Sequence, residues 1–163
     1  MVKGQLAKGG YTYSRTDEDG DLWFKGTVSQ EKANIVASFT PANKLIQVQV
    51  ILAPEESFFI QRFKIIKESL SKKYGPADKN QYAFAAPYKS GDGYETQAIR
   101  LGKATLRSQW MTAWVDSADG RSRESHEGLS LIVNKDLRIY ITYSDKGWNA
   151  EYERRYNKGN NDL

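Results

Sequence analysis

The sequence contains no cysteine, only four prolines, a single histidine and no long apolar run. Without cysteine the chain has no disulfides, no thiolate nucleophile, no iron–sulfur cluster and no Cys-ligated zinc. A lone histidine, His126, excludes any metal site that needs a histidine pair. A membrane-spanning helix needs roughly 18 to 20 consecutive apolar residues, and no stretch approaches that length. The chemistry left open is that of carboxylates, hydroxyls and binding surfaces.

The composition favours one folded domain. A chain of 163 residues, 39% of them hydrophobic and 12% aromatic, can bury a sizeable core. We expect residues 1–157 to form a single α+β domain and residues 158–163 to be a frayed C-terminal tail. The net charge of +4 is mild and its lysines and arginines are spread, which favours solvated surface charge over a nucleic-acid-binding stripe. The first residues, Met1 to Gly4, lack the apolar segment of a signal peptide.

The clearest local pattern is a helix over about residues 55–74. Pro54 and two glutamates suit its first turn, and Gly75-Pro76 suits its end. Between these signals one apolar stripe recurs at helical spacing: Phe59, Phe63, Ile66, Leu70 and Tyr74.

Alternating polar and apolar residues predict strands on both sides of this helix. Three strands are expected before it and four or five after it, over residues 22–28, 34–40, 45–52, 81–85, 96–101, 105–115, 129–133 and 137–143. Short helices are expected at residues 2–8 and 149–156. The pattern predicts an α+β fold, with antiparallel sheet or sheets and the long helix packed on one face. The two halves suggest a possible tandem helix-plus-meander repeat.

Motifs that resemble functional sites each lack an essential part. The run Asp17–Asp21 resembles the start of a calcium loop, but its sixth and twelfth positions hold Leu22 and Val28, so a hairpin tip is the better interpretation. Gly102-Lys103 lacks the Ser or Thr that a phosphate loop requires. Contiguous Ser125-His126-Glu127 cannot form a triad, because neighbours in an extended chain point to opposite faces. We therefore predict no catalytic, cofactor-binding or metal-binding residues and no cofactor.

The best candidate for a binding surface is an aromatic strand flanked by arginines. Trp110 and Trp114 fall on one face of the predicted strand 105–115, and exposed tryptophans could stack bases or sugars. The predicted binding residues are Trp110, Trp114, Arg107, Arg121 and Arg123. The alternative is that the tryptophans form a covered aromatic layer beneath the long helix.

Several stretches together resemble uncharacterised secreted or lipoprotein-like proteins of anaerobic gut bacteria. The most specific is Phe63 to Pro76, and the others are Leu6–Tyr11, Phe24–Gly26, Leu45–Leu52, Leu129–Val133, Tyr143–Asp145 and Asn161–Leu163. The resemblance covers most of the chain and brings no established activity. The arrangement is also similar, as a fold, to the tandem repeats of β-lactamase-inhibitor-like proteins and small outer-membrane-assembly lipoproteins.

The sequence therefore predicts a non-enzymatic cell-envelope or secreted binding or interaction module, with an unknown protein or small ligand as its partner. The resemblance implies a periplasmic or secreted location, and a cytoplasmic one stays open. The alternative is a nucleic-acid-binding domain that uses the aromatic, Arg-flanked sheet face, and a hydrolase working through Asp or Glu ranks third.

Overall fold

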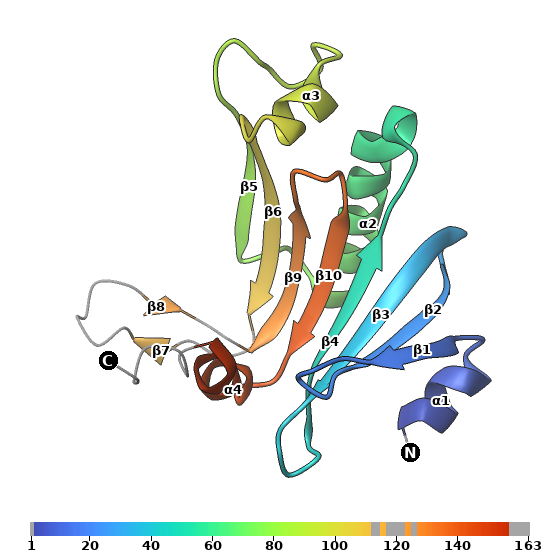
Figure 1. Ribbon diagram of the computed structural model, residues 1–163. Coiled ribbons are helices and arrows are strands. Elements are labelled where there is room, and N and C mark those ends of the chain that lie inside the picture. The colour runs from blue at the N-terminus through green and yellow to red at the C-terminus, as the bar shows by residue number, and fades with distance from the viewer. Residues whose placement is uncertain (1, 112–114, 117–122, 125–126, 157–163) are drawn as a thin grey trace, which may run out of the picture.

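Eight strands form one antiparallel sheet in the order β1-β2-β3-β4-β10-β9-β6-β5 (Figure 1). The computed structural model describes residues 2–111, 115–116, 123–124 and 127–156. The strands of the sheet are β1 (Thr12–Thr16), β2 (Leu22–Val28), β3 (Glu31–Phe39), β4 (Leu45–Leu52), β5 (Lys79–Phe84), β6 (Ala104–Met111), β9 (Gly128–Val133) and β10 (Ile139–Ser144). A separate two-stranded pair consists of β7 (Val115–Asp116) and β8 (Arg123–Glu124).

The strand order consists of two meanders that meet at the centre of the sheet. Strands β1 to β4 pair in chain order, and β5, β6, β9 and β10 do the same from the opposite edge. The last strands of the two meanders, β4 and β10, therefore lie side by side. Helix α1 (Val2–Lys8) precedes the first meander, whereas η1 (Glu56–Phe58) and α2 (Phe59–Tyr74) precede the second. The predicted α+β class with antiparallel strands is confirmed.

Helix α2 covers one face of the sheet. It begins with the single 3-10 turn η1, so the regular helix starts a few residues later than the sequence predicts. Phe59, Phe63 and Ile66 are buried, as the apolar stripe requires, and each contributes about 1.5–3 kcal/mol. The helix ends at Gly75, whose φ of +86° favours a residue without a Cβ.

The main core lies between α2 and the second meander. The side chains that face the helix come from alternate positions of the central strands, as period-2 geometry requires. Fully or nearly fully buried members of this cluster are Leu52, Phe59, Phe63, Leu106, Leu131 and Ile139.

One predicted strand is wrong: residues 96–101 belong to helix α3 (Glu95–Arg100). Ala98 and Ile99 are buried on it, and its charges match the helix dipole, with Glu95 in the first turn and Arg100 in the last. The chain then turns at Gly102, whose φ is +68°. A helix of six residues is too short to show a helical period in the sequence.

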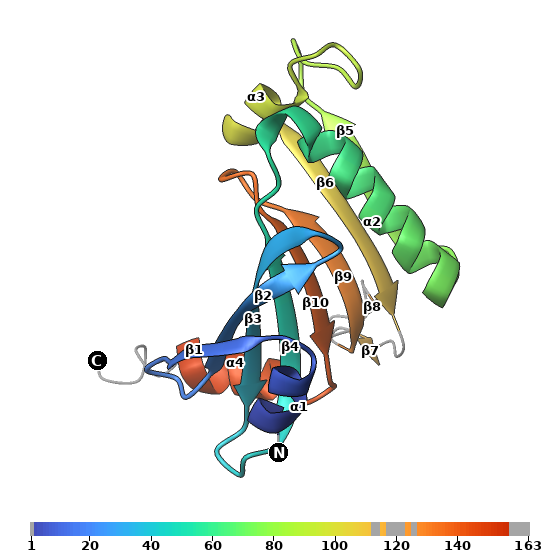
Figure 2. The same cartoon turned by 90° about the vertical axis from the view of Figure 1, so that its right-hand side faces the viewer.

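Helix α4 (Trp148–Tyr156) lies on the opposite face of the sheet from α2 (Figure 2). It agrees with the short terminal helix that the sequence predicts. The predicted tail, residues 158–163, lies outside the described residues. Among the described residues, no helix is long and apolar enough to cross a membrane.

Candidate functional site

The face of the eight-stranded sheet that points away from α2 is here called the polar face. Strand register aligns its side chains in two rows that cross the sheet from edge to edge. The first row contains Lys25, Asn34, Ile51, Tyr140, Ile132, Arg107 and Gln81. The second row contains Arg15, Trp23, Val36, Gln49, Thr142, Ser130, Gln109 and Lys79. Residues from all eight strands thus share one surface.

The centre of the polar face is apolar, with amides and hydroxyls beside it. Ile51 is 8% exposed, while its row neighbours Tyr140 and Ile132 are half-buried. Alongside them, the Gln49 side-chain amide donates a hydrogen bond of 3.2 Å to the Thr142 hydroxyl. Such side chains offer both donors and acceptors to an incoming surface.

The charge on the strands is sorted by face. The eight strands contain five cationic residues, all on the polar face: Arg15, Lys25, Lys32, Lys79 and Arg107.

The one carboxylate in the eight strands, Glu31, lies on the other face, where Arg62 of α2 pairs with it at 2.7 Å. Lys25 and Arg107 are exposed, and neither forms an ion pair within the part of the chain that the structure describes.

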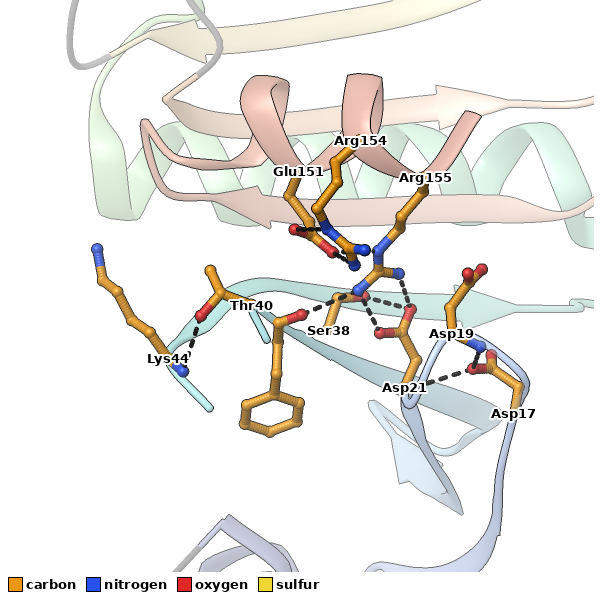
Figure 3. Close-up of polar contacts among 10 residues, drawn as sticks. Asp17, Asp19, Asp21, Ser38, Thr40, Lys44, Glu151, Arg154 and Arg155 are labelled. Carbon is orange, nitrogen blue, oxygen red and sulfur yellow. Dashed lines mark hydrogen bonds and ion pairs between the residues drawn. The ribbon is translucent and has the colours of Figure 1, made fainter. Parts of the chain in front are cut away.

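Helix α4 is held at one end of the polar face by a buried ion network (Figure 3). The Arg155 side chain, 2% exposed, donates to both Asp21 carboxylate oxygens at 2.9 and 3.0 Å and to Glu151 at 2.7 Å. It also donates to the Phe39 carbonyl at 3.0 Å, and the Ser38 hydroxyl donates to Asp21 at 2.7 Å. The C-terminal helix is thereby fastened to the β1–β2 hairpin and β3.

The network gives both of its carboxylates a cationic partner. Hydrogen bonds from Arg154 and then Arg155 lower the pKa of Glu151 to about 2, although burial opposes this effect. The hydrogen bond to Asp21 raises the pKa of Arg155 above its usual value. Asp21 and Glu151 therefore contribute no free negative charge to the polar face beside them.

The acidic run at residues 17–21 forms the tip of the β1–β2 hairpin, as the sequence predicts. One Asp17 carboxylate oxygen accepts hydrogen bonds from the backbone N–H groups of Asp19 at 3.2 Å and Asp21 at 2.9 Å. The other accepts from the Trp23 indole at 2.7 Å. These bonds close the turn. Within the described residues, no group of three or more potential metal ligands is close enough to hold an ion.

A cavity of about 270 Å³ lies where α4 begins, at the edge of the polar face. Its polar lining includes Gln47, Ser130, Thr142 and Ser144, and Trp148 of α4 forms part of its wall. The Gln47 amide donates to the Ser144 hydroxyl at 3.0 Å, so the polar wall is ordered by its own hydrogen bonds. This cavity adds a recess to an otherwise open surface.

A second hollow, of about 420 Å³, lies on the α2 side near the end of that helix. The rings of Tyr74 and Tyr143 meet there edge to face, with centroids 6.4 Å apart. Burial, reinforced by Tyr74, raises the pKa of Tyr143 to about 12, so this phenol stays protonated at neutral pH. The lining of the hollow is mixed: apolar side chains such as Ile46 and Leu129 lie beside the carboxylates Glu127 and Asp145.

Of the predicted binding residues, the structure describes the side chains of Trp110 and Arg107 and places them on opposite faces of β6. Trp110 is 5% exposed and faces α2, and its indole N–H donates to the Gly75 carbonyl at 2.8 Å. Arg107 lies on the opposite face of β6. For Trp110, the alternative of a covered aromatic layer is the one observed. Trp114 and Arg121 lie outside the described residues, and for Arg123 only the backbone, in β8, is described.

Sequence reasoning placed several residues of the polar face correctly without recognising them as a surface. Gln47 and Gln49 were expected on the outer face of their strand, and Tyr140 and Thr142 on the outer face of theirs. Alternation alone gives these orientations. It does not say that β4 and β10 are neighbours, and this pairing is what joins the four side chains into one patch.

The chain matches no family model, no curated protein and no solved structure.

Proposed function

We propose that the protein is a non-enzymatic binding module and that the polar face receives its partner. The observation that carries this proposal is that helices cover the two faces of the sheet to different extents. Helix α2 covers the part of the first face formed by the second meander, whereas on the second face α4 is the one described helix and lies at one end. The second face has an apolar centre, neighbouring amides and a charged periphery, which is the anatomy of a protein interface.

Binding is favoured over hydrolysis because three carboxylates near the polar face, Asp17, Asp21 and Glu151, have structural partners. Asp17 closes a turn, while Asp21 and Glu151 are neutralised by Arg155. A general acid or base needs a carboxyl group that can reach substrate and exchange a proton. A hydrolase working through Asp or Glu is the competing function, and turnover in a screen of generic ester, peptide and glycoside substrates would establish it.

We propose a periplasmic or secreted location, and this rests on the resemblance to secreted and lipoprotein-like proteins. The codons upstream of Met1 in the native gene test it. An apolar segment followed by a small-residue or lipoprotein cleavage site is the expected finding, whereas an in-frame cytoplasmic start without one contradicts it.

We also propose that the two halves are a tandem structural repeat. It is supported by the occurrence of a helix before each meander and by the adjacent positions of β4 and β10 at the centre. Superposition of β1–β4 on β5, β6, β9 and β10 tests the idea. Matching strand order with unmatched strand twist or helix placement would argue against a repeat.

Site-specific photo-crosslinking tests the binding surface itself. A photoreactive phenylalanine analogue replaces Lys25 or Arg107 on the polar face, and in matched controls it replaces Lys8 of α1 or Glu68 of α2, all of them exposed. In the native host, we expect a discrete crosslinked product from the two polar-face positions only. Equal products from the helix positions, or none from the polar face, would contradict the proposal.

A further inference from the structure

We infer that the partner of the polar face is a protein that presents an acidic surface around an apolar or aromatic side chain. The inference rests on the proposed binding function and specifies the chemical character of the partner that binds this face. It follows from the charge on this face and from where that charge lies relative to the apolar centre.

The two cations of the first row lie near its two ends, one residue in from each edge strand, and the apolar residues lie between them. Lys25 on β2 and Arg107 on β6 are separated by five strand spacings, or about 24 Å along the sheet. Ile51, Tyr140 and Ile132 occupy the middle of the row. A partner that buries this middle brings its own periphery against the two cations, where carboxylates are favoured and like charges are repelled.

The carboxylates that could repel such a partner are absent from the strands of this face. The only acidic residue in the eight strands of the sheet, Glu31, points toward α2, where it pairs with Arg62. At the hairpin next to the face, Asp21 is compensated by Arg155 at 2.9 Å. Two carboxylates outside the strands, Asp78 and Glu127, line hollows at the edges of the face. The five strand cations outnumber them, and this excess would steer an acidic surface toward the described part of the face.

A protein fits this arrangement better than a nucleic acid. A single strand needs a continuous basic track beside exposed aromatic platforms on which bases stack. Here the five cations lie on β1–β3 and on β5 and β6, and the three strands between them, β4, β10 and β9, carry none. Trp110 is buried, and the Arg15 guanidinium lies over Trp23, 4.5 Å from its ring centroid. The centre offers isoleucines and amides, which pack against side chains.

The test selects ligands from a phage-displayed random peptide library on the immobilised wild-type protein and measures the enriched peptides by fluorescence anisotropy. A fluorescent oligothymidine is the competing probe. The charge-reversal pair is Lys25→Glu with Arg107→Glu. The matched control is Lys8→Glu with Lys89→Glu, at exposed sites off the polar face. Each pair lowers the formal net charge from +4 to 0, because each reversal subtracts two.

We expect enriched peptides with Asp and Glu around an apolar or aromatic residue. Their affinity should fall by about tenfold or more in the Lys25/Arg107 pair and change little in the control pair. It should also weaken between about 50 and 200 mM salt, because the attraction is screened. Cooperative urea unfolding verifies each variant, and Lys25→Gln with Arg107→Gln replaces any reversal pair that fails to fold.

The other outcomes separate the inference from the function on which it rests. Neutral or basic peptides that lose affinity on Tyr140→Ala, but not on charge reversal, would overturn the acidic partner and leave the binding face intact. Oligothymidine that binds more tightly than the peptides, and is lost on charge reversal, would overturn it in favour of nucleic acid. If no ligand depends on Lys25, Arg107 or Tyr140, both the inference and the proposed function fail.

Discussion

Removal of the Arg155 guanidinium should destabilise the fold far more than removal of the neighbouring Arg154, although both bond the Glu151 carboxylate. The Arg155 side chain is 2% exposed and lies between Glu151 and Asp21. The Arg154 side chain is 39% exposed and pairs with Glu151 at 2.5 Å. The substitution Arg155→Ala leaves the Asp21 side chain, which is only 10% exposed, without its counter-ion.

The two losses differ because Arg155→Ala leaves the buried Asp21 without a cation, whereas Arg154→Ala removes a half-exposed guanidinium and leaves Glu151 paired with Arg155 at 2.7 Å. Removing one partner of a buried ion pair costs about 3–5 kcal/mol, whereas an exposed pair contributes about 0–1 kcal/mol. In a domain of this size, 1 kcal/mol corresponds to about 2–4 °C in Tm. Arg155→Ala should therefore lower Tm by about 6–20 °C, and Arg154→Ala by about 4 °C or less.

Urea unfolding followed by far-ultraviolet circular dichroism at pH 7 measures both free energies of unfolding. A third variant, Arg155→Ala with Asp21→Asn, removes the buried anion and should recover part of the loss, because a neutral amide costs less to bury than a carboxylate. Equal losses in the two single variants, or no recovery in the double variant, would refute the role assigned to Arg155.

Three further predictions concern pH, packing and the buried tryptophan. The pKa of Glu151 is about 2 instead of the usual 4.5, so its contribution to stability is full above about pH 4.5 and is lost as pH falls through about 2. Urea titrations at pH values between these two should show that the free energy of unfolding declines less steeply with falling pH in Glu151→Gln than in wild type. Gly26→Ala places a Cβ 2.2 Å from the Tyr11 ring and should cost about 1–3 kcal/mol, and a double-mutant cycle with Tyr11→Ala should recover most of it; additive losses would show that the ring moves freely. Trp110→Phe removes the 2.8 Å indole hydrogen bond and should cost about 1–2 kcal/mol in thermal melts while peptide binding to the polar face is unchanged; lost binding in a folded variant would place Trp110 in the binding site.

Local structure could be predicted where one period runs through a long segment. The strand at residues 45–52 agrees with β4 at both ends, because apolar residues occupy every second position from Ile46 to Leu52. The helix expected over residues 55–74 agrees with η1 and α2, because its apolar stripe and its Gly75 end are both present in the sequence. Helix α3 was missed because six residues contain fewer than two turns.

Strand order could not be predicted, because it depends on contacts between residues far apart in the chain. Gln49 and Thr142 are separated by 93 positions and are hydrogen-bonded across the centre of the sheet. Arg155 and Asp21 are separated by 134 positions and join the C-terminal helix to the first hairpin. No local sequence pattern predicts either contact. The loop-closure entropy that each pairing requires is overcome only by the packed core as a whole.

Trp110 lies on the covered side of its strand and Arg107 on the open side, and period-2 geometry explains why the two do not share a surface. Arg107 and Trp110 are three positions apart in β6, so they point to opposite faces and cannot form one surface while the strand is regular. Sequence alone does not say which face α2 covers, and the tryptophan proved to be on the covered one.

The polar face differs from the face toward α2 in the charge of its strand residues, and this difference can be seen only when each residue is assigned to a face. The chain has 20 acidic residues, and strands generally disfavour Asp, Glu and Lys alike. If strand propensity alone had acted, lysine and carboxylate would be depleted together. Instead the eight strands retain five cations on one face and a single carboxylate, Glu31, on the other. Complementarity to an acidic partner accounts for that asymmetry, and charge reversal at Lys25 and Arg107 tests this explanation.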